Sequence, residues 1–190
     1  MLFCLVVGTL IAFHPSVAVA QPMAGSGANN SVRIAGRGPD SMQGLGLQLG
    51  FNSDYRKAML AYETPGLWRG KLPGDWGRLN LSVELGLSYW KSWRGDPDSM
   101  WQVSAIPILR WWPRETIYLE AGVGPTVLSR SEFAGRELST RFQFGSYVGG
   151  GILIHGTQRL GIRYSHYSNA DIKTPNPGLD VVQLAYMYMF

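Results

Sequence analysis

The sequence predicts an all-β fold, namely an eight-stranded antiparallel transmembrane β-barrel of the bacterial outer membrane. Apolar and polar residues alternate along about eight segments, many of them close to the 9–11 residues of a tilted membrane strand. No run of 18 apolar residues follows residue 20, which argues against a helical membrane protein. The last segment ends on the aromatic Phe190, which resembles the assembly signal of bacterial outer-membrane proteins.

The chain begins with an apolar segment that is expected to direct export. Residues 1–20 carry no charge and end in the small-residue pattern Ala18-Val19-Ala20. This pattern predicts a secretory signal peptide cleaved before Gln21, although an uncleaved membrane anchor would have similar features. Cys4 lies in this segment, so the rest of the chain contains no cysteine, and no disulfide or thiolate metal site is expected.

The remaining chain divides into a short leader and the barrel. Residues 21–40 are rich in glycine and are expected to form a flexible N-terminal leader or a short plug, and residues 41–190 form the barrel. The 17 Lys and Arg against 13 Asp and Glu give a net charge of +4. Because these charges are scattered and no zinc finger or phosphate-binding loop is present, nucleic acid is not an expected partner.

The strands are assigned from residue parity. In "LNLSVELGLSY", residues 79–89, every second side chain is apolar and the others are polar or small, which only a strand produces. Parity alone does not separate a soluble sandwich from a membrane barrel, but strand length and number favour the barrel. The predicted strands lie near residues 41–51, 54–63, 78–91, 100–112, 115–128, 139–154, 158–169 and 180–190.

The two faces of these strands predict the interior and the membrane boundary. Large polar residues are expected to pair within a lumen that is filled by side chains and forms no pore. They are Glu84, Gln102, Arg110, Glu120, Arg141, Gln143, Arg163 and Gln183. Aromatic residues near strand ends are expected to form a headgroup girdle, although they would also serve to plug the ends of a soluble sheet. They are Trp90, Trp93, Trp101, Trp111, Trp112 and Tyr118.

Three polar side chains continue an outward apolar row near the end of the barrel. With both termini periplasmic, the connections at 51–54, 91–99, 129–138 and 169–179 face outward. In "RLGIRYSHYS", His166 and Ser168 follow three apolar residues on one face, and Asp180 begins the outward row of the last strand. If the last two strands pair so that residue numbers sum to 346, His166 lies opposite Asp180 and within reach of a hydrogen bond.

These residue types suit nucleophilic catalysis. A serine hydroxyl becomes a good nucleophile when an imidazole accepts its proton and a carboxylate orients that imidazole. His166, Ser168 and Asp180 are therefore candidates for base, nucleophile and orienting acid, and the Asn169 amide is a candidate oxyanion donor together with a loop N–H. An ordinary barrel rim would also contain such residues, so spacing alone leaves both interpretations open.

The stretch "RYSHYSNADIKTPNPGLD", residues 163–180, resembles the PagL-type lipid A 3-O-deacylases. The motif of these outer-membrane enzymes runs His-aromatic-Ser-Asn-Ala-Gly, then a Pro-Asn turn, then an acid. The resemblance implies that His166 is the base, Ser168 the nucleophile and Asp180 the triad acid. It also implies an oxyanion hole formed by Asn169 and the backbone N–H of Asp171. Upstream of these eighteen residues, the resemblance is one of pattern only.

Two positions depart from the family motif. Family members often have glutamate where this chain has the shorter Asp180, so the backbones must approach more closely. Asp171 stands where the family has glycine, which places a carboxylate beside the expected oxyanion unless that side chain turns to water or pairs with Lys173.

The resemblance implies hydrolysis of the ester-linked 3-hydroxyacyl chain at the 3 position of lipid A, with the active site facing the outer leaflet. Lipopolysaccharide and outer-membrane lipids are the expected partners, no metal or cofactor is expected, and a homodimer is left open. Lys173, with Arg130 and Arg136, could contact lipid A phosphates, although plain surface solvation would explain these three residues equally well. Two rival interpretations remain, namely another outer-membrane lipid esterase or acyltransferase, and a non-enzymatic barrel for adhesion or envelope anchoring.

Overall fold

A computed structural model describes residues 41–190. The predicted signal peptide (residues 1–20) and the leader or plug (residues 21–40) lie outside the described residues. Within 41–190, no helix is long and apolar enough to cross a membrane.

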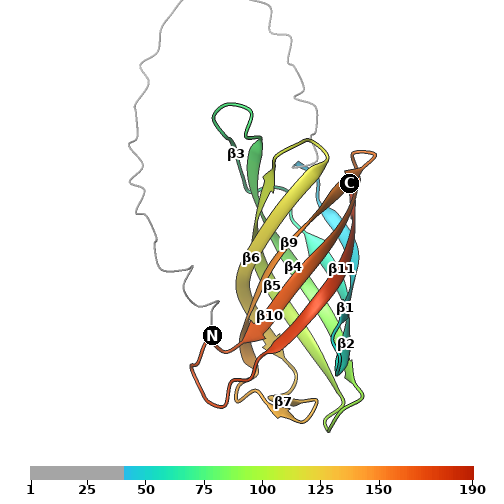
Figure 1. Cartoon of the computed structure of the whole chain (residues 1–190), viewed down its shortest axis with the longest axis vertical. Coiled ribbons are helices and arrows are strands. Elements are labelled where there is room, and N and C mark those ends of the chain that lie inside the picture. The colour runs from blue at the N-terminus through green and yellow to red at the C-terminus, as the bar shows by residue number, and fades with distance from the viewer. Residues whose placement is uncertain (1–40) are drawn as a thin grey trace, which may run out of the picture. The chain divides into compact units, whose positions relative to one another are not determined.

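Eight long strands form a closed antiparallel barrel (Figure 1). Neighbouring strands follow the order β2-β1-β11-β10-β9-β6-β5-β4, and β2 pairs with β4 to close the ring. The fold prediction is thus confirmed, and the observed strand ends lie within three residues of the predicted ones. The strands are β1 (Gly44–Phe51), β2 (Tyr55–Glu63), β4 (Arg78–Ser92), β5 (Ser99–Trp112), β6 (Ile117–Leu128), β9 (Phe142–Ile154), β10 (Gln158–Ser168) and β11 (Leu179–Met189).

Three short strands lie in segments that were expected to be connections. β3 (Trp68–Lys71) pairs with the first residues of β4, so it continues the ladder that β2 makes further along the same strand. β7 (Glu132–Phe133) and β8 (Arg136–Glu137) form a small hairpin in the connection between β6 and β9.

The two ends of the barrel are distinguished by the chain termini. Gln43 and Phe190 exchange backbone hydrogen bonds, so the start of β1 and the end of β11 lie at one end. The connections β1–β2, β4–β5, β6–β9 and β10–β11 lie at the opposite end (Figure 1). We call this opposite end the loop end, and it is where the candidate site lies.

The distribution of side chains is that of a membrane barrel. Along the strands, buried and exposed residues alternate, and the exposed row is mostly apolar. About half of the surface or more is exposed for many of these apolar side chains, for example Leu47, Leu60, Val103, Ile162 and Val182. The buried row contains glutamine, serine, glutamate and arginine. A soluble sheet would have the opposite arrangement, whereas lipid favours an apolar outer wall.

The lumen is filled by an ion-pair network. Arg163 bridges Glu84 and Glu120 at 2.8 and 2.6 Å, and Arg110 bridges Glu120 and Glu63, both at 2.8 Å. Each of these side chains is at most 4% exposed, so each charge depends on its partner for the interactions that water would otherwise supply.

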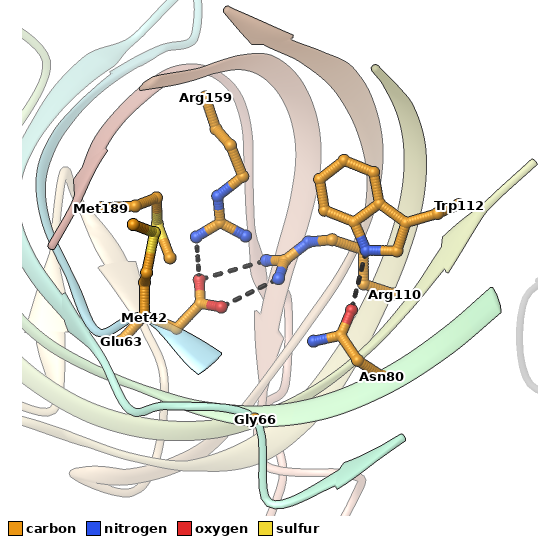
Figure 2. Close-up of a pocket in the computed structure, with 8 residues that line it drawn as sticks. All are labelled: Met42, Glu63, Gly66, Asn80, Arg110, Trp112, Arg159 and Met189. Carbon is orange, nitrogen blue, oxygen red and sulfur yellow. Dashed lines mark hydrogen bonds and ion pairs between the residues drawn. The ribbon is translucent and has the colours of Figure 1, made fainter. Parts of the chain in front are cut away.

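The network also seals the end of the barrel that holds the termini. There Arg159 joins Arg110 on Glu63, beside the Trp112 indole (Figure 2). The cavity that these residues line has a volume of only about 10 Å³, roughly the space needed for one water molecule. The prediction that the interior is filled is therefore confirmed for this end of the lumen.

Two parts of the predicted side-chain placement are wrong. Arg141 was expected in the lumen but is exposed, because β9 begins only at the next residue. Trp90, Trp112 and Tyr118 were expected in a headgroup girdle, but they are at most 3% exposed. They lie on the inward face, where Trp90 packs with Tyr55, Phe133 and Tyr167 at the loop end and Trp112 packs on Tyr118 near the other end.

Candidate active site

His166 and Asp180 form a cross-strand pair on the outer wall. β10 and β11 pair with residue numbers that sum to 346, so His166 lies directly opposite Asp180, as predicted. The imidazole Nδ1 is 2.8 Å from a carboxylate oxygen of Asp180. Both side chains are a little over 40% exposed. This hydrogen bond leaves Nε2 without a partner among residues 41–190 and able to accept a proton from another group.

Ser168 lies two residues beyond His166 on the same strand and the same face. β10 ends at Ser168, and the residue is partly buried opposite Phe144 of β9. Its hydroxyl makes no hydrogen bond to any described residue. Side chains two positions apart on one strand are about 6.6 Å apart at the backbone, so His166 and Ser168 can meet only by leaning together. All three predicted triad residues therefore share the outward face.

Asp180 is fixed by groups beyond the imidazole. The Tyr164 hydroxyl donates to the same carboxylate oxygen that His166 contacts, at 2.8 Å. The Tyr55 hydroxyl both donates to the Asp180 carbonyl and accepts from its N–H, each at 3.0 Å, and the Asn52 amide donates to the same carbonyl. The carboxylate thus has a defined backbone position and a second side-chain donor.

Gly178 packs directly against the imidazole. It adopts a φ of +65°, which L side chains rarely take, and a Cβ built on it would lie 2.7 Å from His166 Cε1. Glycine is therefore needed here for two reasons: it tolerates the positive φ, and it has no side chain to clash with the imidazole.

The side-chain amide of Asn169, predicted as an oxyanion donor, is bonded to two backbone carbonyls in this arrangement. Asn169 lies one residue beyond β10, continues the inward row of that strand, and is fully buried. Its amide donates to the carbonyls of Leu138 and Lys173, at 3.1 and 2.7 Å. The side chain therefore ties the β10–β11 connection to the β6–β9 connection.

Asp171 lies at the sharp bend that follows β10. Ala170 and Asp171 both have positive φ, +53° and +60°, which explains why glycine suits this position and why aspartate is tolerated better than most residues. The Asp171 carboxylate accepts a hydrogen bond from the Asn176 amide at 2.9 Å. Its backbone N–H donates to no acceptor within residues 41–190.

The three cations considered for phosphate contact differ in their surroundings. Arg136 is engaged by Asp54, with a separation of 3.0 Å. Lys173 and Arg130 are exposed, and neither side chain forms an ion pair within the described part of the chain. Among residues 41–190, no group of three or more His, Cys, Asp and Glu is arranged to hold a metal ion.

Four residues that contribute to the site were not singled out from the sequence. Tyr164, Tyr55 and Asn52 hold Asp180, and Asn176 spans the bend by bonding both the Asp171 carboxylate and the Asn169 N–H. Tyr164 had a signal, because the predicted register places it diagonally next to Asp180. Tyr55 and Asn52 lie more than 120 positions away in sequence, and no local pattern points to them.

Comparison with known proteins gives the family. The family model described as "Lipid A 3-O-deacylase (PagL)" matches residues 56–189, well over half of the chain. The chain belongs to the lipid A 3-O-deacylase (PagL) family. This match extends the resemblance from the motif at residues 163–180 to almost the whole barrel.

Individual members of the family support the assignment. A protein named lipid A deacylase PagL from Bordetella bronchiseptica is 50% identical over 150 residues, covering 77% of this chain and 83% of that protein. The protein of the same name from Pseudomonas aeruginosa is 27% identical over 178 residues, covering 87% and 95%.

Solved structures share the barrel fold. The crystal structure of the outer membrane enzyme PagL matches with a TM-score of 0.67 at 23% identity, covering 77% of this chain and 99% of that one. A de novo designed transmembrane β-barrel matches with a TM-score of 0.52 at 9% identity, covering 79% and 96%.

Proposed function

We propose that this chain is an outer-membrane lipid A 3-O-deacylase that releases the 3-hydroxyacyl chain from the 3 position of lipid A. Family membership and the names of its relatives support the substrate and the reaction. The observation that carries the mechanism is the 2.8 Å contact between His166 Nδ1 and Asp180, which leaves Nε2 without a partner among residues 41–190.

In the proposed first step, the Ser168 hydroxyl attacks the ester carbonyl carbon while His166 Nε2 accepts the hydroxyl proton. Asp180 holds the ring tautomer and stabilises the imidazolium that forms. The imidazolium then gives its proton to the departing sugar oxygen, which leaves as the free 3-hydroxyl group. The acyl chain remains on Ser168 as an ester, and a water molecule activated by the same imidazole releases it as a carboxylic acid.

The developing oxyanion needs a donor that is not already bonded. The Asp171 N–H meets this condition, and we assign it as a donor to the oxyanion. Asn169 acts instead as a positioning residue, because its amide holds the bend that orients the Asp171 N–H.

The outward position of the site suits a lipid substrate. Several apolar residues of the outer wall lie near the triad, among them Ile162, Val182 and Leu184. Acyl chains can stay against this wall while the ester reaches Ser168 at the loop end, which we place in the outer leaflet. The alternative barrel for adhesion needs no imidazole-carboxylate pair on its outer wall, so that pair favours the enzyme.

Mass spectrometry of lipid A from cells that express the chain tests this proposal. We expect the loss of one 3-hydroxyacyl mass relative to cells with an empty vector, and recovery of that acyl group as free acid. Ser168→Ala should abolish the loss while the barrel still inserts, because a hydroxyl at a strand end contributes little to packing. Unchanged lipid A with an inserted wild-type barrel would contradict the proposal. An acyl group moved to another lipid would identify an acyltransferase.

A further inference from the structure

A second polar feature lies on the loop end, across β9 from the triad. It is a groove of about 570 Å³ that runs over the ends of β4, β5 and β6 to the start of β9. We call it the arginine groove. Its lining includes the aromatic pair Tyr89 and Trp101, the serine hydroxyls of Ser99 and Ser129, and the guanidinium groups of Arg130 and Arg141.

Hydrogen bonds fix the residues that form the walls of the arginine groove. Ser129 and Trp101 are joined twice, by the Ser129 N–H to the Trp101 carbonyl and by the Trp101 N–H to the Ser129 hydroxyl, both at 2.9 Å. The Arg141 carbonyl accepts the Leu128 N–H at 2.8 Å. Backbone hydrogen bonds therefore fix the main chain at Arg141 and at Ser129, the residue before Arg130, at the outer ends of neighbouring strands.

The two arginines of the groove lack the carboxylate partner that Arg94 and Arg136 have at the loop end. Arg94 and Arg136 both contact Asp54, at 3.3 and 3.0 Å. Neither Arg130 nor Arg141 forms an ion pair or a side-chain hydrogen bond within residues 41–190, and no carboxylate lines the groove.

The Asp98 carboxylate is affected by the positive charge of Arg130, but it is already hydrogen-bonded to Lys91. Hydrogen bonds from Lys91 first and Ser99 second lower the pKa of the Asp98 carboxyl, and the charge of Arg130 contributes least. Arg130 and Arg141 therefore have no carboxylate of their own to bind among residues 41–190. A bound anion would supply the missing negative charge.

The chemistry of the lining identifies the class of anion. An arginine pair matches a phosphate, because each guanidinium can donate two parallel N–H bonds to its oxygens and together they balance a double negative charge. The aromatic rings, 5.0 Å apart and partly exposed, offer apolar faces beside that charge. A phosphate attached to a sugar presents both kinds of group, whereas a free phosphate has no use for the rings.

The groove is close enough to Ser168 to hold part of the same molecule. Ser168 pairs with Phe144 on β9, and Arg141 precedes Phe144 by three residues. One interstrand step and three residues of extended chain separate the Cα atoms of Ser168 and Arg141 by roughly 11 Å. A sugar headgroup and an extended arginine side chain can bridge that separation.

We propose that the arginine groove binds a phosphate on the sugar headgroup of the lipid whose acyl ester reaches Ser168. Arg130 and Arg141 donate to the phosphate, and the Tyr89–Trp101 pair contacts the sugar. This inference rests on the proposed deacylase function, since it gives the same site a second point of contact with its substrate.

The test uses the full-length barrel in detergent micelles and the double variant Arg130→Gln/Arg141→Gln. The matched control is Arg69→Gln/Arg114→Gln, which removes two exposed positive charges near the opposite end of the barrel. Each protein is given phosphorylated lipid A and the same lipid with its phosphates removed. For phosphorylated lipid A, we expect the groove variant to raise KM about tenfold or more with kcat little changed, because charge-assisted bonds are lost. The control should match wild type with both lipids.

A binding measurement separates this inference from the proposed function. Lipid retention is measured with the same arginine changes in a Ser168→Ala background, which needs no turnover. If only the groove variant retains less lipid, and only when the lipid A is phosphorylated, the result supports phosphate binding in the arginine groove, whether or not hydrolysis occurs. Equal retention by all variants would overturn the inference. It would also be overturned if the groove variant lost the same amount of binding with both lipids, or if the control variant lost as much as the groove variant. Displacement of the lipid by an equimolar amount of inorganic phosphate would identify a site for free anion and would also overturn it.

Discussion

Gly178→Ala should slow acyl release by moving the imidazole. Alanine at this position meets two separate penalties. One is the left-handed backbone, with φ +65°, and the other is the contact of its Cβ with His166 Cε1 at 2.7 Å. The first penalty acts on stability, and only the second acts on the orientation of the proposed base.

The chain contains a glycine that isolates the first penalty. Gly156, in the turn between β9 and β10, has a φ of +73°, and a Cβ built there has nothing within 4 Å. Gly156→Ala and Gly178→Ala should each lose about 1–2 kcal/mol of stability from the backbone. At Gly178, an ordinary contact of at least 3.4 Å also requires the ring to move by about 0.7 Å. Because a displacement of about 1 Å can cost a hundredfold in rate, we expect a decrease of roughly 10- to 100-fold.

The assay is single-turnover release of the 3-hydroxyacyl chain by purified barrels. Heat-modified gel mobility shows that each variant is folded before rates are compared. Gly156→Ala should react within about twofold of wild type, since its strain lies far from the triad. Equal rates for Gly178→Ala, Gly156→Ala and wild type, with all three folded, would refute the role of His166 as the base or the contact that places Gly178 against it.

The remaining predictions concern other groups around the same imidazole. Tyr164→Phe removes one of the two donors to the Asp180 carboxylate and should lower kcat about fivefold, the effect of one ordinary hydrogen bond. Tyr186→Phe, which removes an exposed hydroxyl from β11 away from the site, should leave kcat unchanged, and equal rates for both variants would exclude a positioning role for Tyr164. Asp171→Gly and Asp171→Asn should both raise the single-turnover rate, because each removes a negative charge beside the oxyanion. An increase with glycine alone would point to backbone conformation, and no change would show that the Asp171 carboxylate does not act on the oxyanion. Acyl release should also fall as the pH is lowered through the range in which histidine side chains are protonated, because a protonated imidazole cannot accept the serine proton; a flat profile between about pH 5 and 8, with chemistry limiting, would contradict a histidine base.

Residue parity, together with the length and number of the strands, predicted the barrel, and the observed pairing of the last two strands is one of several registers that parity permits. A membrane strand has one lipid-facing row and one lumen-facing row of side chains. Whether a residue number is odd or even therefore predicts which side that residue faces within a strand. The short strand β3 (Trp68–Lys71) could not be found in this way, because its residues are exposed on both faces and lie between glycine- and proline-rich turns.

Arg141 was misplaced because parity was extended beyond the start of β9, whereas the inward aromatic residues were misplaced because parity was not followed to the end of a strand. Trp90 shares the parity of Glu84 and therefore faces the lumen, yet its neighbour Tyr89 faces outward, so two adjacent aromatic residues serve different sides. Asn169 has the parity of Arg163 and continues the inward row just beyond β10, which was readable from sequence. Its partners Leu138 and Lys173 were not readable, because the approach of two connections depends on the closed barrel.

The position of His166 on the outer wall has a kinetic consequence. The imidazole is partly exposed and has Tyr164 and Val182 beside it, so it faces the surroundings of the barrel rather than an enclosed pocket. A substrate dissolved in the same leaflet meets such a site by lateral diffusion in two dimensions. Turnover should then depend on the mole fraction of substrate in the bilayer, and adding inert lipid at a constant bulk amount of substrate should slow it.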